Sequence, residues 1–204
     1  CWQALAAVTS LIVLLAVPVS AEELEPETLN RVNTLPATPD PHWLWVYDMV
    51  YDYMTDGRAS LIDGDSGRFL GMLSTGYSFT QLTLPTHHRE IYSAETYYSR
   101  YTRGTRDDVV SVYSPTTLSP VAEIDIPDKR ASTIPTPHNA VLTDDDHFML
   151  IFNLTPSTSV TVVDVQARLF VGEVETPGFS LIYPTGPRRF FSLCGDGSLL
   201  NVEL

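Results

Sequence analysis

The sequence contains very little cysteine and few basic residues, and both shortages limit what the protein can be. Only two of its 204 residues are cysteine. Two cysteines cannot build a disulfide framework, so the fold has to rest on an apolar core. Lysine and arginine number 12 against 25 aspartate and glutamate residues, which gives a formal net charge of −13. A surface this acidic repels phosphate backbones, and we therefore exclude nucleic acid as a partner.

The motifs of several enzyme classes are also missing. The sequence has no Gly-x-Ser-x-Gly nucleophile elbow and no glycine-rich phosphate loop. His87 and His88 precede Glu90, but adjacent histidines on a strand point to opposite faces, so we do not expect them to share a metal ion. The acidic stretches at 144–146 and 63–65 lack the continuation of a calcium loop and are interpreted as turns. These observations predict no catalytic residue and no metal site on this chain.

The first 21 residues have the character of a targeting segment. Residues 4–19 are uncharged and apolar apart from the small polar residues Thr9 and Ser10, and Val19-Ser20-Ala21 fits the small-residue rule for signal peptidase. A membrane anchor is the alternative, but the apolar stretch is at the short edge for a span. We predict a signal peptide over 1–21, export to the periplasm and no membrane attachment after cleavage. Cys1 would be removed, and the remaining Cys194 is predicted to be a buried free thiol.

Residues 22–41 are rich in glutamate and proline, a composition that does not build a core. We interpret this segment as a solvated linker. An arm that reaches a partner subunit is the alternative.

From residue 42 onward the sequence repeats a unit of two β-rich runs joined by a polar turn. Aligning the units on Asp63, Tyr113 and Asp164 places successive copies 50 and 51 residues apart. A period of about 40–50 residues made of short strands is typical of a β-propeller blade. Gly195-Asp196-Gly197 is a strong hairpin turn in the last copy.

The repeat predicts an all-β protein and, specifically, the N-terminal part of a β-propeller with about three to four blades. The expected blades cover 42–82, 85–135 and 138–182, and residues 184–204 begin the next one. We expect no helix longer than three turns within 42–204.

Two further sets of residues have more than one interpretation. Arg100, Arg103 and Arg106 with Asp107 and Asp108 are interpreted as a solvated loop with exposed ion pairs, and a loop that docks another protein is the alternative. Trp43 and Trp45 share one face of a predicted strand, which favours core packing.

Several segments together resemble one family, the heavy subunit of the quinoprotein amine dehydrogenases. The likeness is nearer to the aromatic amine (aralkylamine) type than to the methylamine type, and it runs from about residue 42 to 204. The segments that carry it are Met54-Thr55-Asp56-Gly57-Arg58, Gly67-Arg68-Phe69-Leu70-Gly71-Met72, the stretch 101–110, Pro156-Ser157-Thr158-Ser159-Val160, Val163-Asp164-Val165 and Cys194-Gly195-Asp196-Gly197-Ser198-Leu199.

The resemblance implies a seven-bladed propeller in a periplasmic complex of two heavy and two light subunits. The cofactor, tryptophan tryptophylquinone, would lie on the light subunit, with none on this chain. The complex would deaminate primary amines oxidatively to an aldehyde and ammonia and pass electrons to a blue copper protein. A propeller that only binds or scaffolds other proteins in the periplasm remains the competing interpretation, because propellers support many functions.

The resemblance also assigns individual residues. Tyr77 matches a phenylalanine that borders the substrate channel in the family, and Phe79 lies in the same segment between two blades. An ordinary aromatic residue at the rim is the alternative for Tyr77. The family pairs the cysteine that matches Cys194 with a second one, but Gly178-Phe179-Ser180 stands at that place here. The resemblance therefore leaves Cys194 without a disulfide partner.

Overall fold

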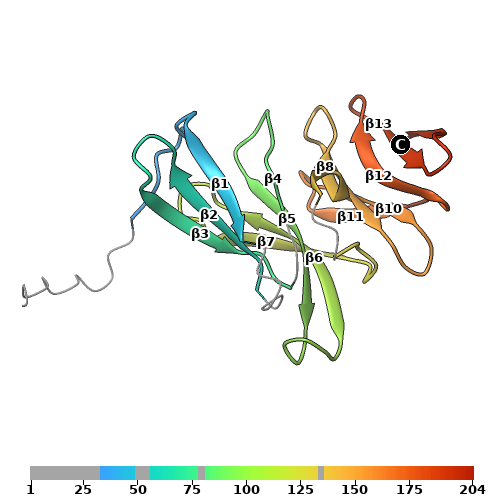
Figure 1. The fold of residues 1–204 in the computed structure, drawn as a ribbon, viewed down its shortest axis with the longest axis horizontal. Coiled ribbons are helices and arrows are strands. Elements are labelled where there is room, and N and C mark those ends of the chain that lie inside the picture. The colour runs from blue at the N-terminus through green and yellow to red at the C-terminus, as the bar shows by residue number, and fades with distance from the viewer. Residues whose placement is uncertain (1–32, 49–55, 78–80, 133–135) are drawn as a thin grey trace, which may run out of the picture. The chain divides into compact units, whose positions relative to one another are not determined.

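A computed structural model of the chain describes residues 33–48, 56–77, 81–132 and 136–204. Nearly all regular structure in these residues is β-strand (Figure 1). The strands are β1 (Trp43–Asp48), β2 (Arg58–Asp63), β3 (Phe69–Ser74), β4 (Leu82–Thr83), β5 (Ile91–Tyr98), β6 (Arg106–Tyr113), β7 (Pro120–Ile126), β8 (Ala140–Leu142), β9 (Phe148–Asn153), β10 (Ser159–Asp164), β11 (Leu169–Glu175), β12 (Phe179–Pro184), β13 (Arg189–Cys194) and β14 (Leu199–Glu203).

Helical structure in the described residues is limited to the 3-10 turn η2 (Pro137–Asn139). The prediction of no helix longer than three turns is confirmed for this part of the chain. No helix in it has the length and apolarity that crossing a membrane requires. The predicted signal peptide lies outside the described residues.

The strands form four antiparallel sheets that follow one another along the chain (Figure 1). The first sheet has the order β1-β2-β3, the second β4-β5-β6-β7, the third β8-β9-β10-β11 and the fourth β12-β13-β14. Each strand pairs with its neighbour in sequence, as expected for blades built from consecutive hairpins.

Two of the expected blade limits are wrong by one strand. Leu82 pairs with Ser93 of β5, so β4 opens the second sheet and does not close the first. Likewise β12 pairs with β13, so the third sheet ends at Glu175 and the fourth begins at Phe179. Both strands stand between two turns. Their sequence carries no signal for which neighbouring sheet they join.

The sequence repeat corresponds to a repeated structural feature. Asp63 is the last residue of β2, Tyr113 is the last residue of β6, and Asp164 is the last residue of β10. The Asp63 and Asp164 side chains each accept two backbone N–H groups of the following turn, at 2.8 to 3.1 Å. The register shifts near the end of each of these strands, between Leu61 and Ile62, Val112 and Tyr113, and Val162 and Val163. A bulge at this place strengthens the twist of each sheet.

The apolar core lies between the sheets, and each sheet packs face to face on the next. The cluster between the second and third sheets unites Tyr92, Ala94, Val110, Val112, Ile124 and Ile126 with Met149, Ile151, Val163 and Val165. A second cluster joins Phe148, Leu150 and Phe152 to Ile182 and Phe190, and a third joins Ala59 and Leu73 to Leu82, Ile91 and Tyr113. Consecutive sheets stacked in this way are the blades of a β-propeller.

Candidate functional site

The segment that contains Tyr77 connects the first sheet to the second. The Tyr77 backbone N–H donates to the Thr96 carbonyl at 2.8 Å, which fixes the segment to the end of β5. Gly57 holds it from the other side, since its N–H donates to the Gly76 carbonyl at 2.6 Å and its carbonyl accepts from Thr75 at 2.8 Å. The segment 75–77 is therefore held by backbone bonds to Thr96 of β5 and to Gly57, the residue before β2. Phe79, the other predicted channel residue, lies outside the described residues.

Gly76 allows this close approach. Its φ angle is +72°, in the left-handed region that favours glycine. A Cβ atom at this position would lie 2.9 Å from the Thr96 carbonyl oxygen and 3.3 Å from the Tyr97 ring. Any other residue would push the segment away from β5.

The Tyr77 ring packs edge to face on Tyr98. The ring centroids are 5.1 Å apart and the planes meet at 86°. Both side chains are half-buried, so each keeps part of its ring exposed to solvent. This arrangement gives an aromatic wall at the end of the second sheet, a favourable surface for an apolar or aromatic group.

A buried carboxyl group lies in the same strand, on the face of β5 opposite to Tyr98. Glu95 is fully buried in β5 and accepts hydrogen bonds from the hydroxyls of Tyr97 (2.6 Å), Ser111 (2.7 Å) and Tyr113 (2.8 Å). Burial raises the pKa of Glu95 above its usual value, although the three hydroxyl donors act in the opposite direction. Burial, followed by the nearby Glu95 charge, also raises the pKa of the Tyr113 hydroxyl.

A second buried network surrounds Asp108. Its carboxylate accepts a two-point interaction from Arg106, with Nε at 2.9 Å and Nη2 at 2.7 Å, and also accepts from the Thr96 hydroxyl at 2.7 Å and the Arg130 backbone N–H at 3.0 Å. The Arg130 guanidinium donates to the same Thr96 hydroxyl at 2.7 Å and reaches the Tyr77 carbonyl at 3.5 Å. Burial lowers the pKa of Arg130 to about 10, so the group is still positively charged at neutral pH. This network anchors Thr96, the residue that holds Tyr77.

The sequence predicted that the charged residues at 100–108 form a solvated loop. Only part of this cluster does so. Arg106 and Asp108 belong to β6, and the Asp108 side chain is fully buried. Strand alternation turns Asp108 inward while its neighbour Asp107 stays exposed.

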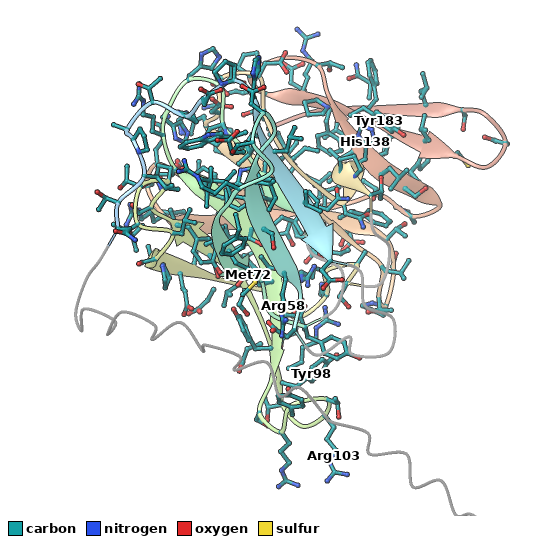
Figure 2. The ribbon with its side chains drawn as sticks, turned by 60° about the vertical axis from the view of Figure 1, so that its left-hand side comes forward. Arg58, Met72, Tyr98, Arg103, His138 and Tyr183 are labelled. Atoms are coloured by element: carbon teal, nitrogen blue, oxygen red, sulfur yellow. The ribbon has the colours of Figure 1, made fainter. Side chains whose placement is uncertain are left out.

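The remaining basic residues of that cluster lie on the turn of the β5–β6 hairpin. Figure 2 shows Tyr98 where the turn of this hairpin begins and Arg103 near its far end. Arg100 and Arg103 are exposed, and Tyr101 is 73% exposed. Backbone bonds from Ser99 to Thr105 (3.0 Å) and from Arg100 to Arg103 (2.9 Å) close the turn.

The two histidines and the acidic turn are brought together, but not as a metal site. His87 Nε2 lies 3.0 Å from the Asp144 carbonyl and His88 Nε2 lies 3.2 Å from the Asp146 carbonyl. Both rings thus reach one turn, contrary to the expected opposite faces, because β5 begins only at Ile91 and the histidines lie in a loop. The described residues contain no group of three or more histidine, cysteine, aspartate or glutamate side chains placed to hold a metal ion.

Part of the predicted linker is also held by the fold. The Leu35 N–H donates to the Thr116 carbonyl at 2.8 Å, and the Arg89 guanidinium donates to the Ala37 carbonyl. Residues 33–41 therefore lie against the chain and are not a free tail. Together with Trp43, Trp45 and parts of the second sheet they line an open pocket of about 310 Å³. The tryptophans do share one face, as predicted, but both are only half-buried there.

Cys194 forms no disulfide with a described residue, and it is half-buried where the sequence predicted burial. It is the last residue of β13, next to the turn at Gly195-Asp196-Gly197, where the strand end opens to solvent. Phe179 is its partner in the antiparallel register.

The role of Tyr77 as a channel residue stays a prediction. The polar residues that are buried near its segment were not predicted, namely Glu95, Thr96 and Arg130. Glu95 directly follows the β-rich run at 90–94. A charged residue inside a strand needs partners, and this was the signal that the sequence contained. Arg130 carried no comparable signal, because it lies 34 residues from Thr96 in the sequence.

Comparison with known proteins gives one family. Residues 40–204 match the family described as methylamine dehydrogenase heavy chain. A methylamine dehydrogenase heavy chain of Methylophilus methylotrophus is 37% identical over 179 residues, covering 88% of this chain and 43% of the relative. The corresponding chain of Paracoccus versutus is 32% identical over 170 residues, covering 81% of this chain and 38% of the relative. The chain thus spans about two fifths of the length of these curated relatives.

Among solved structures, a dihydro-heme d1 dehydrogenase NirN in complex with DHE has a TM-score of 0.50 and 18% sequence identity. The match covers 83% of this chain and 38% of that protein. At this identity the likeness concerns the fold alone.

Proposed function

Because the chain belongs to the methylamine dehydrogenase heavy chain family, we propose that it is part of the heavy subunit of a periplasmic, quinone-dependent dehydrogenase for primary amines. The proposed complex joins two heavy and two light subunits, and a blue copper protein accepts its electrons. The observation that carries the proposal is the family match over residues 40–204, which includes the Tyr77 segment and the two buried networks around Glu95 and Asp108.

The proposed reaction converts a primary amine and water into an aldehyde and ammonia, and two electrons and two protons leave. Tryptophan tryptophylquinone on the light subunit supplies the oxidising group when bound. The part of this chain described by the structure supplies the surroundings, and the aromatic pair of Tyr77 and Tyr98 suits an apolar wall beside such a group.

In this proposal Tyr77 borders the path of the amine. Its half-exposed ring would pack against the substrate and keep water from the reacting carbon. Its hydroxyl gives the wall a polar atom that a phenylalanine would lack. The backbone bonds of its segment to Thr96 and Gly57 fix the backbone, and the contact with Tyr98 orients the ring, as a specificity-determining residue requires.

The size of the amine is the finer part of the proposal. The curated relatives are named for methylamine, whereas the sequence segments predicted an aromatic amine. We propose a primary amine as substrate, and a series from methylamine to a phenylethylamine distinguishes the two types.

The test uses the full-length heavy chain assembled with its light subunit. Tyr77→Ala removes the ring and its contact with the substrate, which is worth about 1–3 kcal/mol. The ratio of kcat/KM for bulky amines to kcat/KM for small amines should therefore shift about tenfold or more. Tyr77→Phe keeps the ring and should retain the preference. Tyr183→Ala, an aromatic truncation in the fourth sheet, is the matched control.

An unchanged preference in Tyr77→Ala, with assembly intact, would remove Tyr77 from the substrate path. Absence of amine oxidation from the assembled complex would favour the scaffold protein instead. The periplasmic location has its own test, since cleavage after Ala21 predicts a mature protein that begins at Glu22, which mass spectrometry detects.

A further inference from the structure

The β5–β6 hairpin places two arginines and a tyrosine on an exposed turn of an otherwise acidic chain. The chain has a net charge of −13. Arg100 and Arg103 are exposed and form no ion pair with any described residue. Tyr101 between them is 73% exposed, so most of its ring is open to a partner.

The turn is ordered by its own bonds. Besides the backbone bonds that close it, the Thr105 N–H donates to the Ser99 hydroxyl at 3.0 Å. Gly104 has a φ angle of +105°, and a Cβ atom there would clash with the same hydroxyl oxygen. An ordered turn loses little conformational entropy when it binds a partner, which favours a docking role over that of a flexible loop.

The two residues that flank the turn, Tyr98 and Arg106, connect the turn to the Tyr77 site. Tyr98 ends β5 and contacts Tyr77, and Arg106, its partner in the β5–β6 register, is held by the buried Asp108. A protein that binds the turn of the hairpin would therefore also lie over the Tyr77–Tyr98 wall.

We propose that the turn Arg100–Arg103 is a docking element for an acidic surface of the light subunit, with Tyr101 as its aromatic anchor. This inference rests on the proposed function. Arginine and tyrosine are the residue types that most often dominate binding energy at interfaces. The two positive charges fit an acidic surface and would repel a basic one. The hairpin thereby positions the light subunit over Tyr77.

The test measures binding of the full-length heavy chain to the purified light subunit at two salt concentrations. The charge reversal R100E/R103E should weaken binding at low salt at least tenfold, mainly through slower association, and should reduce the dependence on salt. Tyr101→Ala should weaken binding about tenfold through faster dissociation. Arg68→Glu, an exposed arginine on the β2–β3 turn, is the matched control and should bind like the wild type.

Circular dichroism and thermal melting verify that the variants fold. Equal light-subunit affinity of R100E/R103E and wild type would overturn the docking proposal and leave the proposed function intact. A change confined to self-association of the heavy chain, or to the rate with the electron acceptor, would also overturn it. If the wild-type chain neither binds a light subunit nor supports amine oxidation, both the proposed function and the docking role are wrong.

Discussion

Phe179 lies directly opposite Cys194 across β12 and β13. The N–H groups of both residues bond elsewhere, to Thr176 and Ser198 at 3.0 Å each. The two residues therefore form a non-hydrogen-bonded pair, in which Cα atoms are about 4.5 Å apart. Disulfides span Cα separations of about 4.4–6.8 Å. The residue at the place where the resemblance implied a second cysteine is thus in position to reach Cys194.

Phe179→Cys should accordingly form a disulfide with Cys194. Closing a loop of about 15 residues stabilises by about 3 kcal/mol, from which the lost packing of the half-buried Phe179 ring subtracts. We expect a net gain of about 1–3 kcal/mol in the free energy of unfolding under oxidising conditions and none after reduction. Urea unfolding with and without reductant measures it. Phe179→Ser is the control, and two titratable thiols in the oxidised variant would contradict the prediction.

Glu95→Gln should change how stability depends on pH. Burial raises the folded-state pKa of Glu95, so the folded protein binds this proton more tightly than the unfolded chain does. The stabilisation is fully present below the unfolded pKa of about 4.3 and is lost as the pH rises through the folded pKa. Between the two pKa values the wild type should lose about 1.4 kcal/mol per pH unit relative to Glu95→Gln.

Urea unfolding of both proteins from pH 4 to pH 8 gives this difference directly, because the remaining carboxyl groups contribute equally to both. A difference that is constant across the range, or that grows in favour of the wild type as the pH rises, would show that Glu95 is ionised in the folded state without cost.

Gly76→Ala should disturb the Tyr77 segment beyond the effect of backbone strain. Gly67 provides a matched control, because its φ angle of +70° nearly equals that of Gly76, yet a Cβ atom there meets nothing within 4 Å. Gly67→Ala should cost about 1 kcal/mol from the φ angle alone. Gly76→Ala should cost at least about 1 kcal/mol more, because it also meets the Thr96 carbonyl. Equal losses in thermal or urea unfolding would mean that the close contact is not important.

Asp108→Asn should be strongly destabilising. It removes the charge that Arg106 and Arg130 share in a buried network, and breaking such a pair costs about 3–5 kcal/mol. The adjacent Asp107 is exposed, so Asp107→Asn should stay within about 0.5 kcal/mol of wild type. Denaturant unfolding of the two single variants measures the change in the free energy of unfolding. If both changes are similarly small, Asp108 is in contact with water and the prediction is wrong.

The sequence was most informative where structure repeats locally. Asp63 and Asp164 could be found because each stands at the start of a polar turn, and the turn residues have a chemistry that periodicity reveals. The turn after Cys194 was predictable for the same reason, and its backbone bond from Cys194 to Ser198 has the expected hairpin form.

Features that depend on long-range packing could not be predicted. The two residues of β4 fit either neighbouring sheet until the Leu82–Ser93 pairing decides. His87 and His88 were assigned to a strand because no local signal marks where β5 begins. Predicting the hydrogen bond between Arg130 and Thr96 requires knowing which faces of the sheets are buried. That depends on the packing of the whole core.

The stacking of sheets in chain order has a consequence for biosynthesis. Each sheet is made of strands that are consecutive in the sequence, and its apolar face packs on a sheet that was translated before it. At about 5–20 residues per second, a ribosome needs about 3–10 s for a unit of about 50 residues. From the second sheet onward, each sheet therefore emerges after the sheet on which it packs, from the ribosome or from an export channel, and the chain can assemble from its N-terminal sheet onward.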